Sequence, residues 1–182
     1  MSDITIRPAL VDDARTIADI HIRSFLESYA HLPKTHRAAQ GGLEKRLRLW
    51  KRLLRDPEKT TLVACQDEGV VGFIHLGLSA DADADEWTGH IFSVHVDPLL
   101  TRRGIGSRLV STATAELADQ GFRIATLWAV SDNERVHRFY DHLGWQRDGA
   151  ARMEKLSVGT EDGDEVEVSR FGRELTDTAG GR

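Results

Sequence analysis

A basic segment that contains two glycines has the residue types of a phosphate-binding turn. It reads Val94-His-Val-Asp-Pro98 and continues Leu-Leu-Thr-Arg-Arg-Gly104-Ile-Gly106-Ser-Arg108. This pattern predicts that a strand ends at a proline turn and that a helix then begins, and the first N–H groups of a helix lack partners within it. The helix dipole favours an anion there, the glycines allow close backbone approach, and the arginines add positive charge. The segment is therefore predicted to bind phosphate.

The spacing of the glycines excludes two other nucleotide-binding motifs. Leu109 stands where a dinucleotide fingerprint needs its third glycine, and no Gly-Lys-Ser/Thr sequence is present for a P-loop. The incomplete fingerprint also disfavours an NAD-dependent oxidoreductase. One structural interpretation stays open, in which the glycines only permit a tight turn and close packing of the helix.

Asn133 and Tyr140 form a second polar pair. The range Ser131–Glu134 has the spacing of a capping box, which predicts the start of a helix. The two residues lie two helical turns apart, so they would share one face of that helix. In the alternative interpretation Tyr140 is a core residue on a stripe with Val136, and Asn133, the only asparagine of the chain, caps the first turn.

The periodicity of the first half of the chain predicts a strand, two helices and three strands, in that order. They are a strand at Ile4–Arg7, a helix from the N-cap Asp12 to about Tyr29, a loop at Ala30–Gln40, a helix at Leu43–Arg55, and strands at Thr61–Gln66, Val70–Leu78 and Trp87–Val96. The acidic segment between the last two strands has no apolar period and is predicted to be a solvated loop.

The second half predicts two helices and three strands. They are a helix from Gly104 to Gly121, a strand at Ile124–Val130, a helix that ends at about His142 before Gly144, and strands at Met153–Val158 and Val166–Phe171 around a turn at Gly159–Gly163. The whole order predicts one mixed α/β domain over residues 1–172, followed by a frayed tail at 173–182.

The composition limits the classes of protein to which the chain can belong. Its length of 182 residues predicts one domain, and 40% hydrophobic residues suffice for a core. No apolar run approaches the roughly 18 residues of a membrane helix, and the N-terminus lacks the apolar segment of a secretion signal. The single cysteine, Cys65, cannot form an internal disulfide or a multi-thiolate metal site, so we expect a cytoplasmic protein without a metal. The net charge of -5 disfavours nucleic acid and membrane surfaces as partners.

Two motifs resemble those of the GNAT superfamily of acetyl-CoA-dependent N-acetyltransferases. The first family motif, Val-x-Pro and then Arg/Gln-x-x-Gly-x-Gly/Ala before a helix, corresponds to Val96–Pro98 and Thr101–Gly106. The second, Asn-x-x-Ala-x-x-Phe-Tyr and then Leu-Gly-Phe, corresponds to Asn133–Tyr140 and Leu143–Trp145, with valine in place of alanine and tryptophan in place of phenylalanine. Thr101 replaces the usual Arg or Gln, so one side-chain contact is expected to be lost while the backbone amides still bind phosphate. The resemblance covers about residues 3–172.

The resemblance implies a GNAT fold, which is a mixed, mostly antiparallel twisted sheet of about seven strands flanked by about four helices. A splayed pair of central strands would hold acetyl-CoA as cosubstrate. The residues implied to bind it are Val94, His95, Val96, Arg102, Arg103, Gly104, Ile105, Gly106, Ser107, Asn133 and Tyr140. Tyr140 is also implied to protonate the departing thiolate, and a backbone N–H near Val94 to polarise the thioester carbonyl.

Acetylation of an ammonium also needs a base, or a path through water, that removes a proton. His90 lies near the position where many relatives carry a glutamate, and an imidazole titrates near neutral pH, so His90 is the expected base. His95, His75 and Glu86 are the alternatives. Cys65 has no neighbouring base motif that would make it an acyl carrier, so direct attack in a ternary complex is expected.

The expected function is the transfer of an acetyl group from acetyl-CoA to a primary amine, with a small amine or an amino acid as the first choice of acceptor. The alternatives are acetylation of a protein N-terminus or lysine, and a CoA-binding regulatory domain without turnover. The acidic loop Asp81–Glu86 and the segment Phe25–Gln40 are expected to form the walls that select the acceptor. Homodimers are common in the family, although no residue in the sequence identifies an interface.

Overall fold

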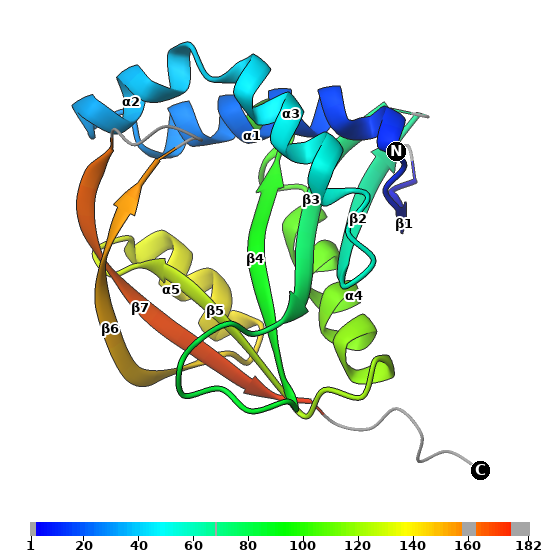
Figure 1. The fold of residues 1–182 in the computed structure, drawn as a ribbon, viewed down its shortest axis with the longest axis vertical. Helices are drawn as coiled ribbons and strands as arrows, with labels where there is room; N and C mark the ends of the chain where they lie inside the picture. The colour runs from blue at the N-terminus through cyan, green and yellow to red at the C-terminus, as the bar shows by residue number, and fades with distance from the viewer. Residues whose placement is uncertain (1–2, 68, 158–162, 176–182) are drawn as a thin grey trace.

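The chain folds into a central sheet with helices on both faces (Figure 1). The computed structural model describes residues 3–67, 69–157 and 163–175. The strands are β1 (Thr5–Pro8), β2 (Lys59–Gln66), β3 (Gly69–Leu78), β4 (Thr88–Val96), β5 (Ile124–Val130), β6 (Gln146–Leu156) and β7 (Asp164–Glu174). The helices are α1 (Ala14–Ser28), α2 (Pro33–Gln40), α3 (Leu43–Leu53), α4 (Ile105–Asp119) and α5 (Glu134–His142). Among the described residues, no helix combines the length and the apolar composition needed to cross a bilayer.

The seven strands lie in the order β1-β2-β3-β4-β5-β7-β6. Neighbouring strands are antiparallel except for β4 and β5, which are parallel. The predicted mixed, mostly antiparallel sheet is therefore confirmed, and the described residues contain five α-helices where about four were expected.

Each face of the sheet buries its own apolar cluster. α1 and α3 pack against β2 and β3 through Ile17, Trp50 and Phe73. α4 covers the other face through Leu109 and Leu117, and α5 joins that second cluster. The apolar period that predicted α4 from the sequence is therefore the face that this helix buries.

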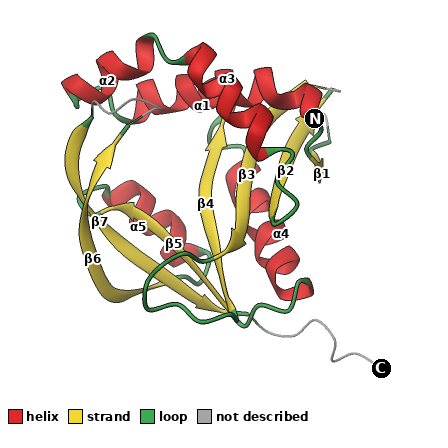
Figure 2. Ribbon diagram, viewed as in Figure 1, coloured by secondary structure: helices red, strands yellow, loops and turns green. Residues whose placement is uncertain are grey.

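β4 and β5 pair over only a short length. The partners are Thr88–Ile91 and Ile124–Leu127, whereas β4 continues to Val96 and β5 to Val130. In the β3–β4 ladder, His75 pairs with Ser93 and Leu76 with Ile91, so Phe92 is an extra residue that bulges from β4. Beyond the paired part, the two groups of strands separate towards α1 (Figure 2). The edge of β4 that faces β5 has no strand partner there.

One prediction from the sequence is wrong, because part of the expected loop at Ala30–Gln40 forms the helix α2. The first turn of α2 has no local side-chain cap. Instead, the backbone N–H groups of Lys34 and Thr35 both donate to Oδ2 of Asp164, at 2.9 Å each. A carboxylate far away in the sequence therefore caps this helix, and the local signal for its start was Pro33 at the first helical position.

Two predicted helix caps also differ in the structure. α1 begins after Asp13 instead of Asp12, and the Asp13 carboxylate pairs with Arg7 at 2.7 Å. The capping box at Ser131 does not form, because Asn133 is the N-cap of α5 and Oγ of Ser131 lies 2.8 Å from Oγ of Ser169. The helices themselves were predicted correctly, and only the residue that starts each one was misassigned.

β6 and β7 are both longer than the sequence predicted. β6 begins at Gln146 instead of Met153, and the pairing of β6 with β7 is interrupted between Arg147 and Ala151. Gly149, with a φ of +91°, lies inside this irregular stretch, which is why the sequence lacks a continuous strand pattern there. β7 runs to Glu174, past the expected domain limit. Most of the expected turn at residues 159–163 and of the tail lies outside the described residues.

Thr35, Leu156 and Asp164 form a clasp that joins α2 to β6 and β7. Oγ1 of Thr35 donates to the carbonyl of Leu156 and accepts from the N–H of Asp164, at 2.9 Å each. Thr35 is fully buried. In Figure 1, α2 lies against the ends of β6 and β7, so the clasp rejoins the two groups of strands beyond the point where β4 and β5 separate.

The clasp leads to a prediction about stability. Thr35→Val keeps the shape of the side chain but removes the hydrogen bonds to the partly buried carbonyl of Leu156 and N–H of Asp164, which should cost about 1–3 kcal/mol in the free energy of unfolding. Urea denaturation measures this loss. The matched control is Thr16→Val on the exposed face of α1, which should change the free energy of unfolding by less than about 0.5 kcal/mol. Equal effects of the two substitutions would contradict the clasp.

Candidate functional site

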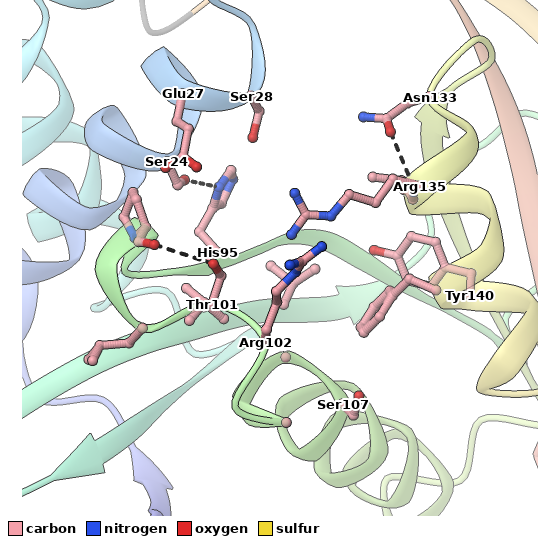
Figure 3. Close-up of a pocket in the computed structure, with 18 residues that line it drawn as sticks. Ser24, Glu27, Ser28, His95, Thr101, Arg102, Ser107, Asn133, Arg135 and Tyr140 are labelled. Atoms are coloured by element: carbon pink, nitrogen blue, oxygen red, sulfur yellow. Dashed lines mark hydrogen bonds between the residues drawn. The ribbon is translucent and has the colours of Figure 1, made fainter.

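A cavity of about 690 Å³ opens where the two groups of strands separate. Its walls come from the C-terminal half of α1, the separated part of β4, the turn before α4 together with the first turn of that helix, and α5 (Figure 3). This volume is typical of pockets that bind small molecules or cofactors.

The start of α4 gives one end of the cavity a positive character. Gly104 precedes the helix with a φ of +76°, and a Cβ atom built there would meet no atom within 4 Å, so the backbone conformation and not space requires glycine. Arg102 has a φ of +65°. The first N–H groups of α4 have no acceptor within the helix. Arg102 and Arg135 extend their guanidinium groups into the centre of the cavity (Figure 3), so this end suits an anion.

Most of the residues predicted to bind the cosubstrate meet at this cavity. Those that line it are Val94, His95, Val96, Arg102, Gly104, Gly106, Ser107, Asn133 and Tyr140. Arg103 and Ile105 do not line it. Ile105 instead packs into the core with 1% exposure, and Arg103 is exposed outside the cavity. The roles that the resemblance gives to all these residues stay predictions.

Tyr140 lies on the α5 wall with its hydroxyl open to the cavity. Its ring packs against Trp145 and Phe171, and the residue is 6% exposed. The hydroxyl has no hydrogen-bond partner in the described part of the chain, yet it is not among the fully buried unpaired atoms there, which are Nε and Nη2 of Arg46 and Nε1 of Trp145. Burial raises the pKa of Tyr140 above its ordinary value, so the phenol keeps its proton at neutral pH.

Asn133 combines its structural role with a place in the cavity wall. Its Oδ1 accepts a hydrogen bond from the N–H of Val136 at 3.2 Å, which caps α5. The amide nitrogen of the same side chain remains available to a ligand. The structural and functional interpretations of this residue are therefore compatible.

The candidate bases lie in different places. His90 is 8% exposed, has its Nδ1 2.8 Å from Oγ1 of Thr126, and lies outside the cavity lining. Nδ1 of His75 lies 2.9 Å from Oγ1 of Thr61, and His75 is also outside the cavity lining. Glu86 is exposed in the loop before β4 and does not line the cavity. His95 does line it. Which of these residues acts as a base stays a prediction.

Ser24 was not predicted as a site residue, and it lines the cavity from α1 together with Glu27 and Ser28. The last two fall within the segment expected to form an acceptor wall. The signal was the spacing of Ser24 and Ser28, one turn apart on a helix whose other face is apolar. Oγ of Ser24 lies 2.5 Å from Nδ1 of His95, so α1 and β4 meet in the wall of the cavity.

An ion pair holds α1 against the end of β4. The two terminal nitrogens of Arg23 donate to the two carboxylate oxygens of Asp97 at 2.8 and 2.9 Å. Asp97 also accepts from the N–H of Leu99 at 3.0 Å, in the turn that leads to α4. The Arg23 guanidinium holds the pKa of Asp97 below its usual value, because hydrogen bonds to the charged form favour it. One carboxylate therefore links the α1 wall to the turn before α4.

Comparison with known proteins agrees with this geometry. The acetyltransferase (GNAT) family model matches residues 15–145. A mycothiol acetyltransferase of Acidimicrobium ferrooxidans is 33% identical over 84 residues, which are 46% of this chain. The match spans only 27% of the length of that relative.

Two solved structures share the fold of the chain. The PaiA N-acetyltransferase of Thermoplasma acidophilum, in complex with coenzyme A, has a TM-score of 0.73 at 18% identity, over 94% of this chain and 99% of that chain. The ribosomal-protein-alanine N-acetyltransferase of Brucella melitensis has a TM-score of 0.73 at 19% identity, over 94% of this chain and 99% of that chain.

Acidification is expected to destabilise the protein from about pH 6.5 downwards. Burial lowers the pKa of His75, His90 and His95 to about 4, and lowers that of His21 well below the ordinary value of 6.5. As the pH falls below 6.5, the unfolded chain therefore binds protons that the folded chain does not, and the free energy of unfolding decreases.

Urea midpoints at pH 7.5, 6.0 and 5.0 measure this decrease. His75→Gln removes one of the four groups and should flatten the decline between pH 6.0 and 5.0. A midpoint that stays constant down to pH 5.0 in the unmodified protein would contradict the prediction.

Proposed function

Because this chain belongs to the GNAT acetyltransferase family, we propose that it transfers the acetyl group of acetyl-CoA to the nitrogen of a small primary amine. The observation that carries the proposal is the cavity in which the phosphate-binding turn, the unpaired edge of β4 and the hydroxyl of Tyr140 meet. Acetyl-CoA has three matching parts, namely a pyrophosphate, an extended arm with amide groups, and a thioester.

The residues of the cavity fit each part of this cosubstrate. The N–H groups at the start of α4, with Arg102 and Arg135, suit the phosphates. The edge of β4 beyond Ile91 offers N–H and C=O groups to the amides of the arm, in the manner of an added strand. A backbone N–H near Val94 would polarise the thioester carbonyl, which is the kind of donor worth roughly 3 kcal/mol in other acyl transfers.

Tyr140 supplies the proton for the leaving group in this proposal. The amine nitrogen attacks the carbonyl carbon, the new C–N bond replaces the C–S bond, and the Tyr140 hydroxyl protonates the sulfur. An ammonium loses two protons when it becomes an amide, so one of them restores Tyr140 and the other passes to solvent. The position of Tyr140 in the cavity wall supports this role, and burial, which raises its pKa, keeps the phenol protonated before each turnover.

A protein N-terminus is the second candidate acceptor. It is favoured by the structural likeness to a protein described as a ribosomal-protein-alanine N-acetyltransferase. A small amine stays the first choice of acceptor, as expected from the sequence.

The experiment that tests the proposal has two stages. Acetyl-CoA, CoA and NADH are first titrated separately against thermal stability, since a ligand at 100 times its dissociation constant adds about 2.7 kcal/mol to the folded state. Thiol release is then followed with free amino acids, phosphinothricin, aliphatic diamines and a peptide with an N-terminal alanine. Stabilisation by acetyl-CoA and CoA with turnover of a small amine supports the proposal. Stabilisation without turnover of any amine would favour a regulatory CoA-binding domain, and stabilisation by NADH alone would overturn the proposal.

A pair of glycine variants tests the phosphate-binding turn. Gly104 and Gly121 flank the same helix, both with positive φ and open space around the position of Cβ. Gly104→Asp and Gly121→Asp therefore add the same charge and similar backbone strain, but only the first lies in the cavity. Gly104→Asp should weaken acetyl-CoA binding at least 10-fold in calorimetry, while Gly121→Asp should leave it within about twofold. Equal affinities would remove the turn from the site.

The two tyrosines of the chain test the proposed acid. Tyr140→Phe should lower kcat by about 10²-fold or more, the usual effect of a general acid, with the affinity for acetyl-CoA almost unchanged. Tyr29→Phe is the comparison, because Tyr29 does not line the cavity and contributes only after burial to the raised pKa of Tyr140, so kcat should stay almost unchanged. Steady-state kinetics at saturating acetyl-CoA give the comparison. An unchanged kcat in Tyr140→Phe would take the role away from this residue.

A further inference from the structure

His95 forms part of the cavity wall on the side of α1. Its ring stacks on that of His21 with 4.3 Å between centroids, and the ring of Phe73 lies 5.4 Å away. Tyr140 stands on the opposite side of the cavity (Figure 3). An amine between the two would meet an imidazole on one side and a phenol on the other.

The hydrogen bonds of Ser24 determine the tautomer of His95. Oγ of Ser24 lies 3.3 Å from the carbonyl oxygen of His21 and 2.5 Å from Nδ1 of His95. A carbonyl only accepts and a serine hydroxyl has one proton, so the two contacts are hydrogen bonds at the same time only when that proton goes to the carbonyl of His21. In the arrangement that satisfies both, Nδ1 of His95 donates its own proton to Oγ of Ser24. Because a neutral imidazole carries a single proton, Nε2 keeps a free lone pair.

Nε2 of His95 is also accessible. It has no hydrogen-bond partner in the described part of the chain. If it were enclosed, it would be a fully buried unpaired atom, but the only such side-chain atoms in the described ranges belong to Arg46 and Trp145. The lone pair of Nε2 is therefore open to a ligand.

We propose that Nε2 of His95 takes one of the protons that the acceptor nitrogen loses, and that Ser24 is the positioning residue that keeps this nitrogen free. This inference rests on the proposed function. The first proton moves from the ammonium to Nε2 before the attack, because the nitrogen needs a free lone pair to form the C–N bond, and His95 then releases this proton to solvent. The second proton leaves the nitrogen after the C–N bond has formed and restores Tyr140, so the two side chains handle the two protons on opposite sides of the reacting atoms.

The surroundings of His95 lower its pKa, so the imidazole releases its proton again after each proton transfer. The charged and titratable groups around it are His21 and Glu27 on α1, Arg46 on α3, and Arg102 and Arg135 in the cavity lining, while β3 contributes the uncharged ring of Phe73. Arg46 is 6% exposed and two of its guanidinium nitrogens have no partner in the described residues. Burial, and after it the charge of Arg46, lowers the pKa of His95 to about 4.

His90, the base expected from the sequence, is the natural comparison. It lies on the same strand, is also largely buried, and contacts a hydroxyl, that of Thr126, at 2.8 Å. It differs from His95 in lying outside the cavity lining. The pH dependence of His95→Gln and His90→Gln therefore separates the two assignments.

The test measures kcat/KM against pH for the most active amine of the panel, together with the dissociation constant of acetyl-CoA. His95→Gln should lower kcat about 10²-fold or more, remove the acid limb of the profile, and leave acetyl-CoA affinity within about threefold. Ser24→Ala should lower kcat and shift that limb, and Ser24→Thr, which keeps the hydroxyl, should restore both. Thr61→Val, which takes a hydroxyl away from His75 outside the cavity, is the control and should leave the profile unchanged.

Several results would overturn the inference. An acid limb that persists in His95→Gln and disappears in His90→Gln would return the role to His90, while acetyl-CoA binding and turnover would still support the proposed function. A wild-type protein that binds no acetyl-CoA or turns over no amine would overturn both.

A second measurement needs no acceptor. Long-range ¹⁵N–¹H spectra at pH 7, in which the His95 signals are assigned by their absence in His95→Gln, should show the ring proton of His95 on Nδ1. In Ser24→Ala the proton should no longer favour Nδ1 over Nε2. A proton on Nε2 in the wild-type protein would contradict the proposal whatever the kinetics.

Discussion

The early end of pairing between β4 and β5 is the constraint on which the rest of the site depends. The two strands share a ladder only as far as Ile91 and Leu127, and β4 then runs on with one unpaired edge. Backbone N–H and C=O groups strongly prefer partners, so an unpaired edge inside a protein is a place for a ligand that can supply them. The separation also creates the volume of the cavity, because no strand fills the space between the unpaired parts of β4 and β5.

An opening through the middle of a sheet has to be held open from outside it. The Arg23–Asp97 pair joins α1 to the end of β4, and the clasp joins α2 to β6 and β7. These contacts close a frame around the cavity through parts of the chain that are far apart in sequence. By holding α1 against β4, the Arg23–Asp97 pair also keeps Ser24 in contact with His95.

The electrostatics of the cavity separate two tasks. Positive charge collects at the turn before α4 and on Arg135, where it suits phosphates, whereas His95 and Tyr140 are both neutral at pH 7. Because both side chains are neutral before the reaction, the protein does not bear the cost of keeping them charged and buried while they exchange protons with the amine. Burial keeps the histidines neutral, and it also makes the folded state less stable in acid. Acid stability and the proposed proton transfer at His95 therefore both depend on the desolvation of buried imidazoles.

The sequence by itself determined the parts of the site that are local. The turn before α4, the start of that helix and the two-turn spacing of Asn133 and Tyr140 depend on neighbouring residues, and from them the family was predicted correctly. Tertiary structure alone decided the rest. Asp164 caps α2 from across the fold. The bulge at Phe92 inserts one residue into β4 and so reverses the alternation of side chains along the strand, which no local pattern reveals. The sequence favoured His90 as the base, whereas the fold brings His95 into the cavity wall and leaves His90 outside it.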